Sequence, residues 1–125
     1  MQVVKTDNAP AAIGPYSQAV SAGSFLFCSG QIPLDPKSGH IIGETAGEQT
    51  VQVMANLRAV LKSAGCDFKN VVKTTIYLKD MNSFVAVNEA YAAAMADHRP
   101  ARATVEVARL PKDVLVEIDC VAVLS

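Results

Sequence analysis

The sequence predicts an α+β fold in which one β-sheet carries two helices on a single face. Three observations favour this fold class. Segments with strand character outnumber the helical ones, in the order strand, hairpin, helix, strand, helix, strand, strand. Each helical segment has one apolar stripe rather than an apolar surface all round, which is typical of helices that pack on one side of a sheet. Residues 1–125, half of them hydrophobic, are enough for one domain with a substantial core.

The N-terminal part of the chain predicts a short strand, a loop and a hairpin. Residues 2–6 have strand character, and the loop over residues 7–17 contains two prolines and a glycine. Residues 18–22 and 25–30 are separated by a Gly-Ser pair, which predicts a β-hairpin. The stretch that follows, LDPKSGHIIGE, is rich in turn residues and predicts a loop.

The first helix has the clearest start signal in the chain. Thr45 and Glu48 form a T-x-x-E capping box, in which each side chain satisfies a backbone N–H of the other residue. The apolar positions that follow recur at helical spacing, namely Val53, Met54, Leu57, Val60, Leu61 and Ala64. Gly65 then stands where a glycine commonly ends a helix, so we expect the helix to stop there.

A strand, a second helix and two strands complete the prediction. Residues 71–78 are rich in β-branched side chains and predict a strand. Asp80 or Asn82 is suited to cap the second helix. The apolar face of this helix consists of Phe84, Val87, Tyr91 and Met95. Residues 101–107 and 114–124 predict the last two strands, joined by a turn.

The last strand is apolar on both of its faces. One face consists of Val114, Val116, Ile118, Cys120 and Ala122, and the other includes Leu115, Val121 and Val123. Two helices on one side of the sheet leave the second face without cover. Since the sequence offers no third layer, we expect a neighbouring subunit to cover that face.

Composition excludes several classes of function. With 11 basic and 12 acidic residues the net charge is −1, so the basic bias of nucleic-acid-binding proteins is absent. The cysteines are odd in number and widely spaced, and both histidines stand alone. We therefore expect neither a disulfide framework nor a metal site. The N-terminus has no apolar run of signal-peptide length and no segment is long enough to cross a bilayer, which predicts a cytoplasmic protein without membrane contact.

Two charged residues in the predicted strands are candidates for one polar site. Strand periodicity places Arg102, Thr104 and Glu106 on the same face of their strand. Glu117 lies in the middle of an apolar strand, where a carboxylate is costly to bury without a partner. The alternatives are a plain Arg102–Glu117 ion pair or an arginine on a solvated edge, and composition alone favours them.

Four further residues are weaker candidates. Asn88 leans towards the apolar stripe of the second helix, and Tyr16 follows Pro15 in a rigid loop. Ser29 and Gly30 end a strand, where backbone N–H groups can face a ligand. Each also has an ordinary structural interpretation, as a boundary amide, a packing aromatic or a turn. No nucleophile elbow, phosphate-binding loop or catalytic triad pattern is present.

Several stretches together resemble the reactive-intermediate deaminase family, the RidA or YjgF group of imine deaminases. The similarity includes NAPAAIGPYSQA (residues 8–19), SGQIPLDPKSG (29–39), VVKTTIYLKDMNSF (71–84), VNEAY (87–91), PAR (100–102) and VEVARLPKDVLVEID (105–119). These motifs cover most of the chain, in order. The combination of PAR, VARLPKD and VEI is the most specific part of the resemblance.

The resemblance implies a fold, an assembly and a reaction. The fold is a chorismate-mutase-like α+β subunit, and three subunits form a homotrimer with pockets in the clefts between neighbours. The reaction is hydrolysis of enamines and imines, such as 2-aminoacrylate, 2-iminobutanoate and 2-iminopropanoate, to 2-keto acids and ammonia. The family resemblance implies no metal and no organic cofactor. It also implies a role in removing reactive metabolites formed in amino-acid metabolism.

The resemblance also assigns roles to individual residues. Arg102 matches the arginine that binds the substrate carboxylate, and a guanidinium fork suits that group. Glu117 matches the acidic residue that positions the attacking water and exchanges a proton with it. The matching substrate-binding positions are Tyr16, Ser29, Gly30, Asn88 and Thr104. Because an imine carbon is already electrophilic, no strong nucleophile is required.

This chain departs from the family pattern at two positions. Thr104 stands where many relatives have cysteine. The resemblance assigns to this position a backbone N–H that donates to the substrate carboxylate, and threonine keeps that N–H. Arg99 stands where relatives often have an aromatic residue in a longer link, so the substrate range is open. Two other functions also remain open. One is non-catalytic binding or sensing of 2-keto acids, and the less favoured one is a ribonuclease or translation inhibitor.

Overall fold

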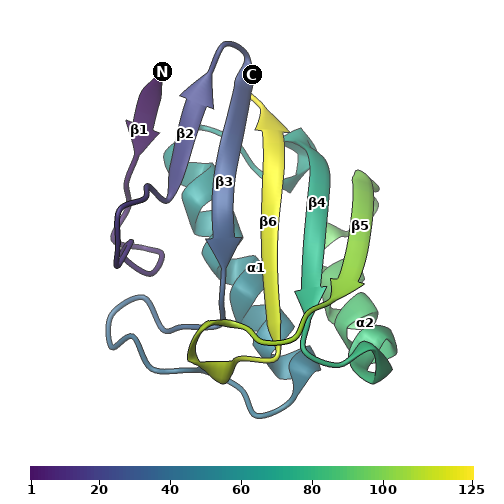
Figure 1. The fold of residues 1–125 in the computed structure, drawn as a ribbon. Helices are drawn as coiled ribbons and strands as arrows, with labels where there is room; N and C mark the ends of the chain where they lie inside the picture. The colour runs from purple at the N-terminus through teal and green to yellow at the C-terminus, as the bar shows by residue number, and fades with distance from the viewer.

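The structure is a computed structural model that describes residues 1–125. It forms one six-stranded sheet with both helices on the same face (Figure 1). The elements in chain order are β1 (Gln2–Val4), β2 (Ala19–Ala22), β3 (Phe25–Gln31), α1 (Ala46–Ser63), β4 (Val71–Leu78), α2 (Phe84–Met95), β5 (Ala101–Glu106) and β6 (Val116–Val123). The predicted α+β class, the strand order along the chain and the one-sided helix layer are confirmed.

The C-terminal strand lies in the middle of the sheet. The spatial order is β1-β2-β3-β6-β4-β5, and β6 is antiparallel to both of its neighbours. Helix α2 connects β4 to β5, which run parallel to each other, as expected for a β-α-β crossover. Strand β5 is therefore an edge strand, and the strands of the predicted hairpin, β2 and β3, pair antiparallel.

The core lies between the sheet and the two helices. Helix α1 packs against β3, β6 and α2. The largest fully buried side chains are Leu26, Val53, Met54, Leu57, Val60, Leu61, Val71, Ile76, Leu78, Val87, Val114 and Ile118. Apart from Val114, which precedes β6, these side chains come from both helices and from the helix-facing positions of the strands, and they belong to one continuous core.

The start signal of α1 forms as predicted. The Thr45 hydroxyl accepts a hydrogen bond from the backbone N–H of Glu48 at 3.2 Å, and the Glu48 carboxylate accepts from the N–H of Thr45 at 3.1 Å. These two bonds satisfy donors that the first turn of a helix otherwise leaves free. At the other end, Gly65 has a φ of +78°, the conformation that favours glycine after a helix.

The predicted cap of the second helix acts one turn earlier than expected. Asp80 accepts a hydrogen bond from the N–H of Asn82 at 2.9 Å, and it caps a short 3₁₀ turn, Met81–Ser83. Helix α2 begins after that turn, at Phe84, without a side-chain cap of its own. The 3₁₀ turn is also tied to the sheet, because the Glu106 carboxylate accepts from the N–H of Met81 at 2.8 Å.

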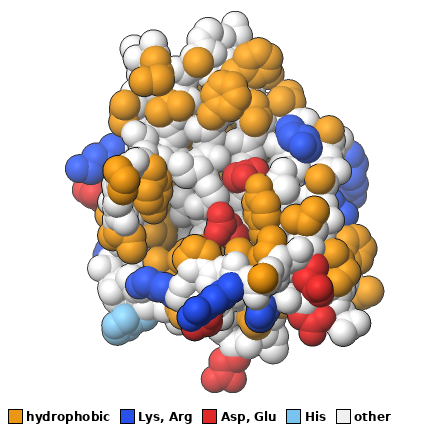
Figure 2. All heavy atoms as spheres, in the orientation of Figure 1, with side chains coloured by type: hydrophobic (Ala, Val, Ile, Leu, Met, Phe, Trp, Pro, Cys, Tyr) orange, Lys and Arg blue, Asp and Glu red, His pale blue; other side chains and the backbone are white.

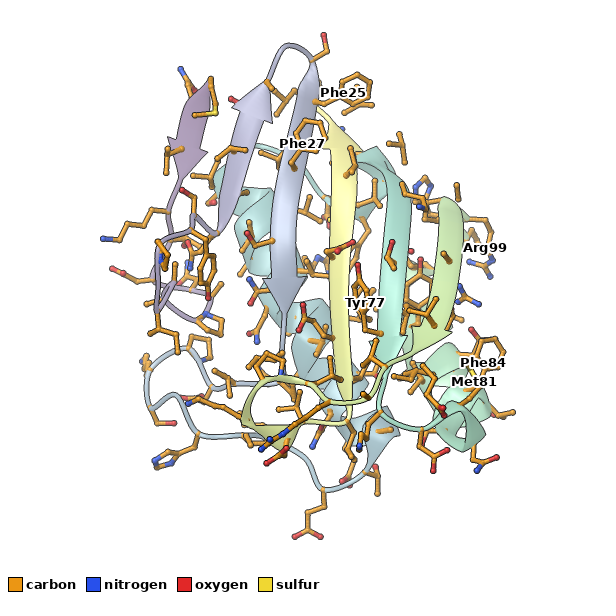
Figure 3. The ribbon with its side chains drawn as sticks, viewed as in Figure 1. Phe25, Phe27, Tyr77, Met81, Phe84 and Arg99 are labelled. Carbon is orange, nitrogen blue, oxygen red and sulfur yellow. The ribbon has the colours of Figure 1, made fainter.

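The sheet face opposite the helices is open and largely apolar. Along β6 buried positions alternate with half-buried ones, as its two-faced sequence predicts. Phe25, Phe27 and Val105 lie on the open face with exposed fractions of 45%, 46% and 41%. Figure 2 shows this face, with hydrophobic side chains gathered at one end and acidic groups near its middle. Figure 3 shows the two phenylalanines there.

The cysteines and the helices bear on two of the sequence-based expectations, those on disulfides and on membrane contact. Cys28, Cys66 and Cys120 are free and buried. Cys28 and Cys120 lie opposite each other on neighbouring strands, among apolar side chains of the helix-facing core. Neither helix has the length and apolar character that crossing a bilayer requires.

Candidate functional site

The carboxylate of Glu117 lies on the open face of the sheet, directly against Gly30. Glu117 sits on the central strand β6, opposite Tyr77 of β4. A Cβ added at residue 30 would lie 2.9 Å from the carboxyl carbon of Glu117 and would clash with its Oε2 atom. The missing side chain of Gly30 therefore makes room for the carboxylate, and the two predicted site residues are in contact.

Ser29 and Gly30 occupy an irregular point of β3. The pairing register between β3 and β6 shifts between Cys28 and Gln31, which leaves the two residues in a β-bulge. The Ser29 hydroxyl donates to the carbonyl of Ser17 at 2.6 Å, and its N–H donates to the carbonyl of Gln18 at 2.9 Å. These bonds hold the bulge against the segment that carries Tyr16.

Gln18 fixes the N-terminal loop beside this bulge. Its side chain is 3% exposed. Its amide nitrogen donates to the carbonyls of Thr6 at 3.1 Å and Pro10 at 2.8 Å. Its amide oxygen accepts from the N–H of Thr6 at 2.7 Å. Sequence reasoning did not identify this residue, because a glutamine at the start of a hairpin strand carries no recognisable pattern.

Tyr16, Ser29, Gly30 and Glu117 line one pocket of about 410 Å³. Tyr16 is 53% exposed, so its ring forms part of the wall rather than of the core. The structure thus brings together four of the seven predicted site residues, from the N-terminal loop, the β3 bulge and the middle of β6. The volume is suited to a small ligand.

Glu117 is held in a state that favours protonation. Burial raises the pKa of its carboxyl group above the ordinary value, and the negative charge of Asp119 raises it further. Glu117 accepts no hydrogen bond within the chain and takes part in no ion pair, whereas Asp119 accepts one from the Tyr77 hydroxyl at 3.0 Å. A carboxylate with free acceptor positions and a raised pKa is suited to proton exchange with a bound molecule.

Lys112 lines the same pocket from a strained loop, and sequence reasoning did not identify it. Lys112 and Asp113 have positive φ angles of 56° and 57°, which non-glycine residues rarely adopt. Arg109 holds this conformation by a two-point contact with Asp113, at 2.7 and 3.2 Å. Strain of this type is often found beside functional sites. The sequence shows only a Pro-containing turn here.

Arg102 lies on the other face of the sheet, at its β5 edge. Its register partner is Thr74, a helix-facing position of β4, whereas Glu117 pairs with Tyr77 on the open face. The two charged groups are therefore on opposite faces of one sheet, and the simple ion pair between them does not form within the chain. Period-2 counting could not reveal this arrangement, because it does not relate the faces of different strands.

The Arg102 guanidinium is oriented by side chains of α2. Its Nη1 donates to the Asn88 side-chain oxygen at 2.7 Å. Its carbon Cζ lies 5.1 Å from the centre of the Tyr91 ring and 5.7 Å from that of Phe84, within the range of cation–π attraction. Asn88 and Arg102 are thus in direct contact, and both line a second pocket of about 280 Å³.

Thr104 is the predicted site residue that lines neither of these two pockets. It lies on the same face of β5 as Arg102, two residues further along the strand. Its hydroxyl oxygen is buried and has no hydrogen-bond partner. An unpaired buried hydroxyl costs free energy, so this position is under-satisfied in the single subunit.

Comparisons with known proteins relate this arrangement to a family. The sequence profile of the endoribonuclease L-PSP family matches residues 6–124. A RutC family protein of Pyrococcus horikoshii is 54% identical over 121 residues, which are 97% of this chain and 96% of that protein. A 2-iminobutanoate/2-iminopropanoate deaminase of Mus musculus is 50% identical over 122 residues, which are 98% of this chain and 90% of that protein.

The fold is also shared with solved structures. TdcF of Escherichia coli, solved with bound serine, superimposes with a TM-score of 0.93 at 39% identity, and the match covers 100% of both chains. Similarity of this extent shows that the two proteins share the same fold.

Proposed function

This chain belongs to the endoribonuclease L-PSP family, and we propose that it is a deaminase that hydrolyses small imines and enamines to 2-keto acids and ammonia. Its substrates are then 2-iminobutanoate, 2-iminopropanoate and 2-aminoacrylate. The observation that carries this proposal is Glu117, a carboxylate with a raised pKa and free acceptor positions in a small pocket. The names of relatives with about half of their residues identical support the reaction class.

In the proposed reaction Glu117 acts as the proton carrier. Its carboxylate accepts a proton from a water molecule while the water oxygen bonds to the imine carbon, and the C=N bond becomes a C–N single bond. The protonated Glu117 returns this proton to the nitrogen, which gives a carbinolamine with one OH and one NH2 group. Glu117 then transfers the hydroxyl proton to the nitrogen, and the C–N bond breaks as the C=O bond forms, so that ammonia leaves and the carboxylate is restored. Water is consumed and no oxidation occurs. Because burial and the charge of Asp119 raise its pKa, Glu117 is a stronger proton acceptor when ionised and keeps its proton more readily, which suits it to these proton transfers.

Arg102 is the group that binds the substrate carboxylate in this proposal. Asn88 engages only Nη1, so Nε and Nη2 are free to form a two-point contact with a carboxylate. The stacked rings of Tyr91 and Phe84 restrict the guanidinium to one orientation. The serine bound to TdcF carries a carboxylate of the same kind.

Arg102 and Glu117 can act on one substrate only if they come from different subunits. Within one subunit they lie on opposite faces of the sheet, and they line two different pockets. We therefore place the complete site between neighbouring subunits of a homotrimer, as the family resemblance implies. The exposed apolar side chains of the open face support such an assembly, because a lone subunit would leave Phe25 and Phe27 half in water.

A coupled assay tests the reaction. A threonine dehydratase releases an enamine that decays to 2-oxobutanoate, and this protein should accelerate the appearance of the keto acid in proportion to its concentration. Arg102→Ala should lower kcat/KM by roughly ten- to hundredfold, since a charge-assisted hydrogen bond contributes about 1.5–3 kcal/mol. Arg58→Ala, which removes an arginine that lines neither pocket, is the matched control.

The same preparation separates the proposed enzyme from the alternatives. Binding of 2-oxobutanoate in a calorimeter, without any acceleration of imine decay, would show a binding protein rather than an enzyme. Cleavage of RNA that persists in Arg102→Ala and copurifies with the chain would support the ribonuclease function instead. The near-zero net charge disfavours that outcome.

A further inference from the structure

A second arginine faces the pocket that contains Arg102. The pocket of about 280 Å³ is lined by Asn88, Tyr91, Ala92, Arg99, Pro100 and Arg102, with no acidic residue among them. Figure 3 shows Arg99 just beyond the β5 edge of the sheet. Both guanidinium groups lower the pKa of the Tyr91 hydroxyl, against the stronger raising effect of burial, so both positive charges act at the same place.

Arg99 is held in position by the end of helix α2. Its Nη1 donates to the carbonyls of Ala96 and His98. The turn that brings it there is well defined, because Ala96 has a φ of +54° and His98 contacts the carbonyl of Val71 at 2.7 Å. A positive charge at the C-terminus of a helix is favourable. Together with the two hydrogen bonds, it holds the Arg99 side chain in place without a ligand.

The two arginines retain free hydrogen-bond donors, and both residues line the same pocket. All bonds of Arg99 and of Arg102 come from Nη1, which leaves the Nε–Nη2 fork of each guanidinium unused. Neither arginine forms an ion pair. Two like charges beside one small pocket repel each other, and an anion with two negative groups would satisfy both forks at once.

We propose that, among the small imines that the site accepts, this pocket prefers those with a second carboxylate, such as those derived from acidic amino acids, over the monocarboxylates, with Arg102 binding the 2-carboxylate and Arg99 the distal one. This inference rests on the proposed function, because it names the substrate class of that same site. The small volume limits the ligand to a short carbon chain. Arg99 is thus a specificity-determining residue rather than a catalytic one.

Binding experiments test the charge preference without requiring turnover. Calorimetry with 2-oxoglutarate and 2-oxobutanoate compares a dicarboxylate with a monocarboxylate of related structure. The wild-type chain should bind 2-oxoglutarate more tightly, and Arg99→Gln should reduce the ratio of the two affinities by about ten- to hundredfold. Arg99→Lys, which keeps the charge but loses the fork, should give an intermediate ratio.

A kinetic arm uses imines generated in place by amino-acid oxidases from aspartate and from alanine. The ratio of kcat/KM for the dicarboxylate imine to that for the monocarboxylate imine should fall in Arg99→Gln. It should not change in the control Arg58→Gln, which removes one positive charge elsewhere on the surface.

The outcomes separate this inference from the proposed function. Equal affinities for both keto acids, or an unchanged ratio in Arg99→Gln with normal folding, would overturn the role of Arg99 and show a helix-end contact only. Acceleration of neither imine, together with preferred binding of 2-oxoglutarate, would reject the deaminase while retaining the two-arginine pocket.

Discussion

The two faces of the same sheet are built for different tasks. Towards the helices, β6 presents Val116, Ile118, Cys120 and Ala122, all buried, and the residues around them form a continuous core. Towards the open side, the intervening residues of the same strand include Glu117 and Asp119 and are only half-buried. One strand thus contributes to stability through one set of alternate residues and, in the proposed function, to chemistry through the other.

The comparison teaches how a small domain can hold a costly carboxylate. The free energy that keeps the strand in place comes from the covered face, where apolar groups are removed from water. The open face can therefore carry Glu117 without a partner, at a cost that the core offsets. Substitutions at four positions test this division, in order of decreasing expected effect.

Replacing Glu117 should have the largest effect on activity, and it should not lower the stability of the fold. Glu117→Gln should lower kcat/KM for imine hydrolysis by about 10²- to 10⁴-fold, the contribution typical of an acid–base group. The pKa of Glu117 is higher in the folded than in the unfolded state, so the folded state binds the proton more tightly. The free energy of unfolding therefore decreases as pH rises from the unfolded-state pKa to the folded-state pKa. The variant should therefore have an equal or higher Tm at pH 7, and this difference should vanish at low pH. A clearly lower Tm at pH 7 would mean that Glu117 stabilises the fold.

On the covered face a substitution should lower the stability of the fold, in contrast to the change at Glu117. Ile118 is fully buried beside Glu117 in the sequence, and Ile118→Ala should lower the free energy of unfolding by about 2–5 kcal/mol. Ile118→Val removes one methylene group and should lower it by about 0.5–1.5 kcal/mol. Urea titrations followed by circular dichroism give both values. Equal losses for the two variants would contradict the close packing of this face.

A charge on the open face should disrupt assembly before it disrupts the subunit. Phe27→Glu places a carboxylate among the apolar side chains of that face, where burial by a neighbouring subunit would be costly. Light scattering after gel filtration should show smaller particles than for the wild-type chain. Val51→Glu, at a 61% exposed position of α1, is the control and should leave the particle size unchanged. A Phe27→Glu protein of wild-type size would argue against cover by a second subunit.

The smallest expected effect is a shift in pH dependence. The charge of Asp119 raises the pKa of Glu117, so Asp119→Asn should lower that pKa and move the acidic limb of the kcat/KM profile to lower pH. Asp67→Asn removes a remote carboxylate that is paired with Arg58 and should not move the limb. A limb that stays in place in Asp119→Asn would show that another group controls it.

Much of the fold was predictable because local signals agreed with the final packing. The capping box at Thr45, the glycine after α1 and the two-faced pattern of β6 each predict a structural feature that is present. The cap at Asp80 was predicted in type but one turn out of place, since a 3₁₀ turn intervenes before α2. Such a turn has no spacing of its own that a sequence could reveal.

The site was less predictable, because it depends on relations between distant elements. Tyr16, Ser29, Gly30 and Glu117 come together only through the β3 bulge and the sheet order. The separation of Arg102 from Glu117 follows from strand register, which periodicity within each strand does not contain. The strained backbone at Lys112 has no counterpart in residue preferences, so no sequence pattern points to it.

One buried amide has a consequence for how the molecule moves. The N-terminal loop is attached to the sheet through Gln18, whose single side chain bonds backbone groups of Thr6 and Pro10. Displacement of the Gln18 side chain would remove all of these bonds at once, so we expect the loop to open as one cooperative unit. Because Tyr16 lies at the end of this loop, a brief opening would displace one wall of the Glu117 pocket, and it would expose Ala9, the loop residue that is buried in the core.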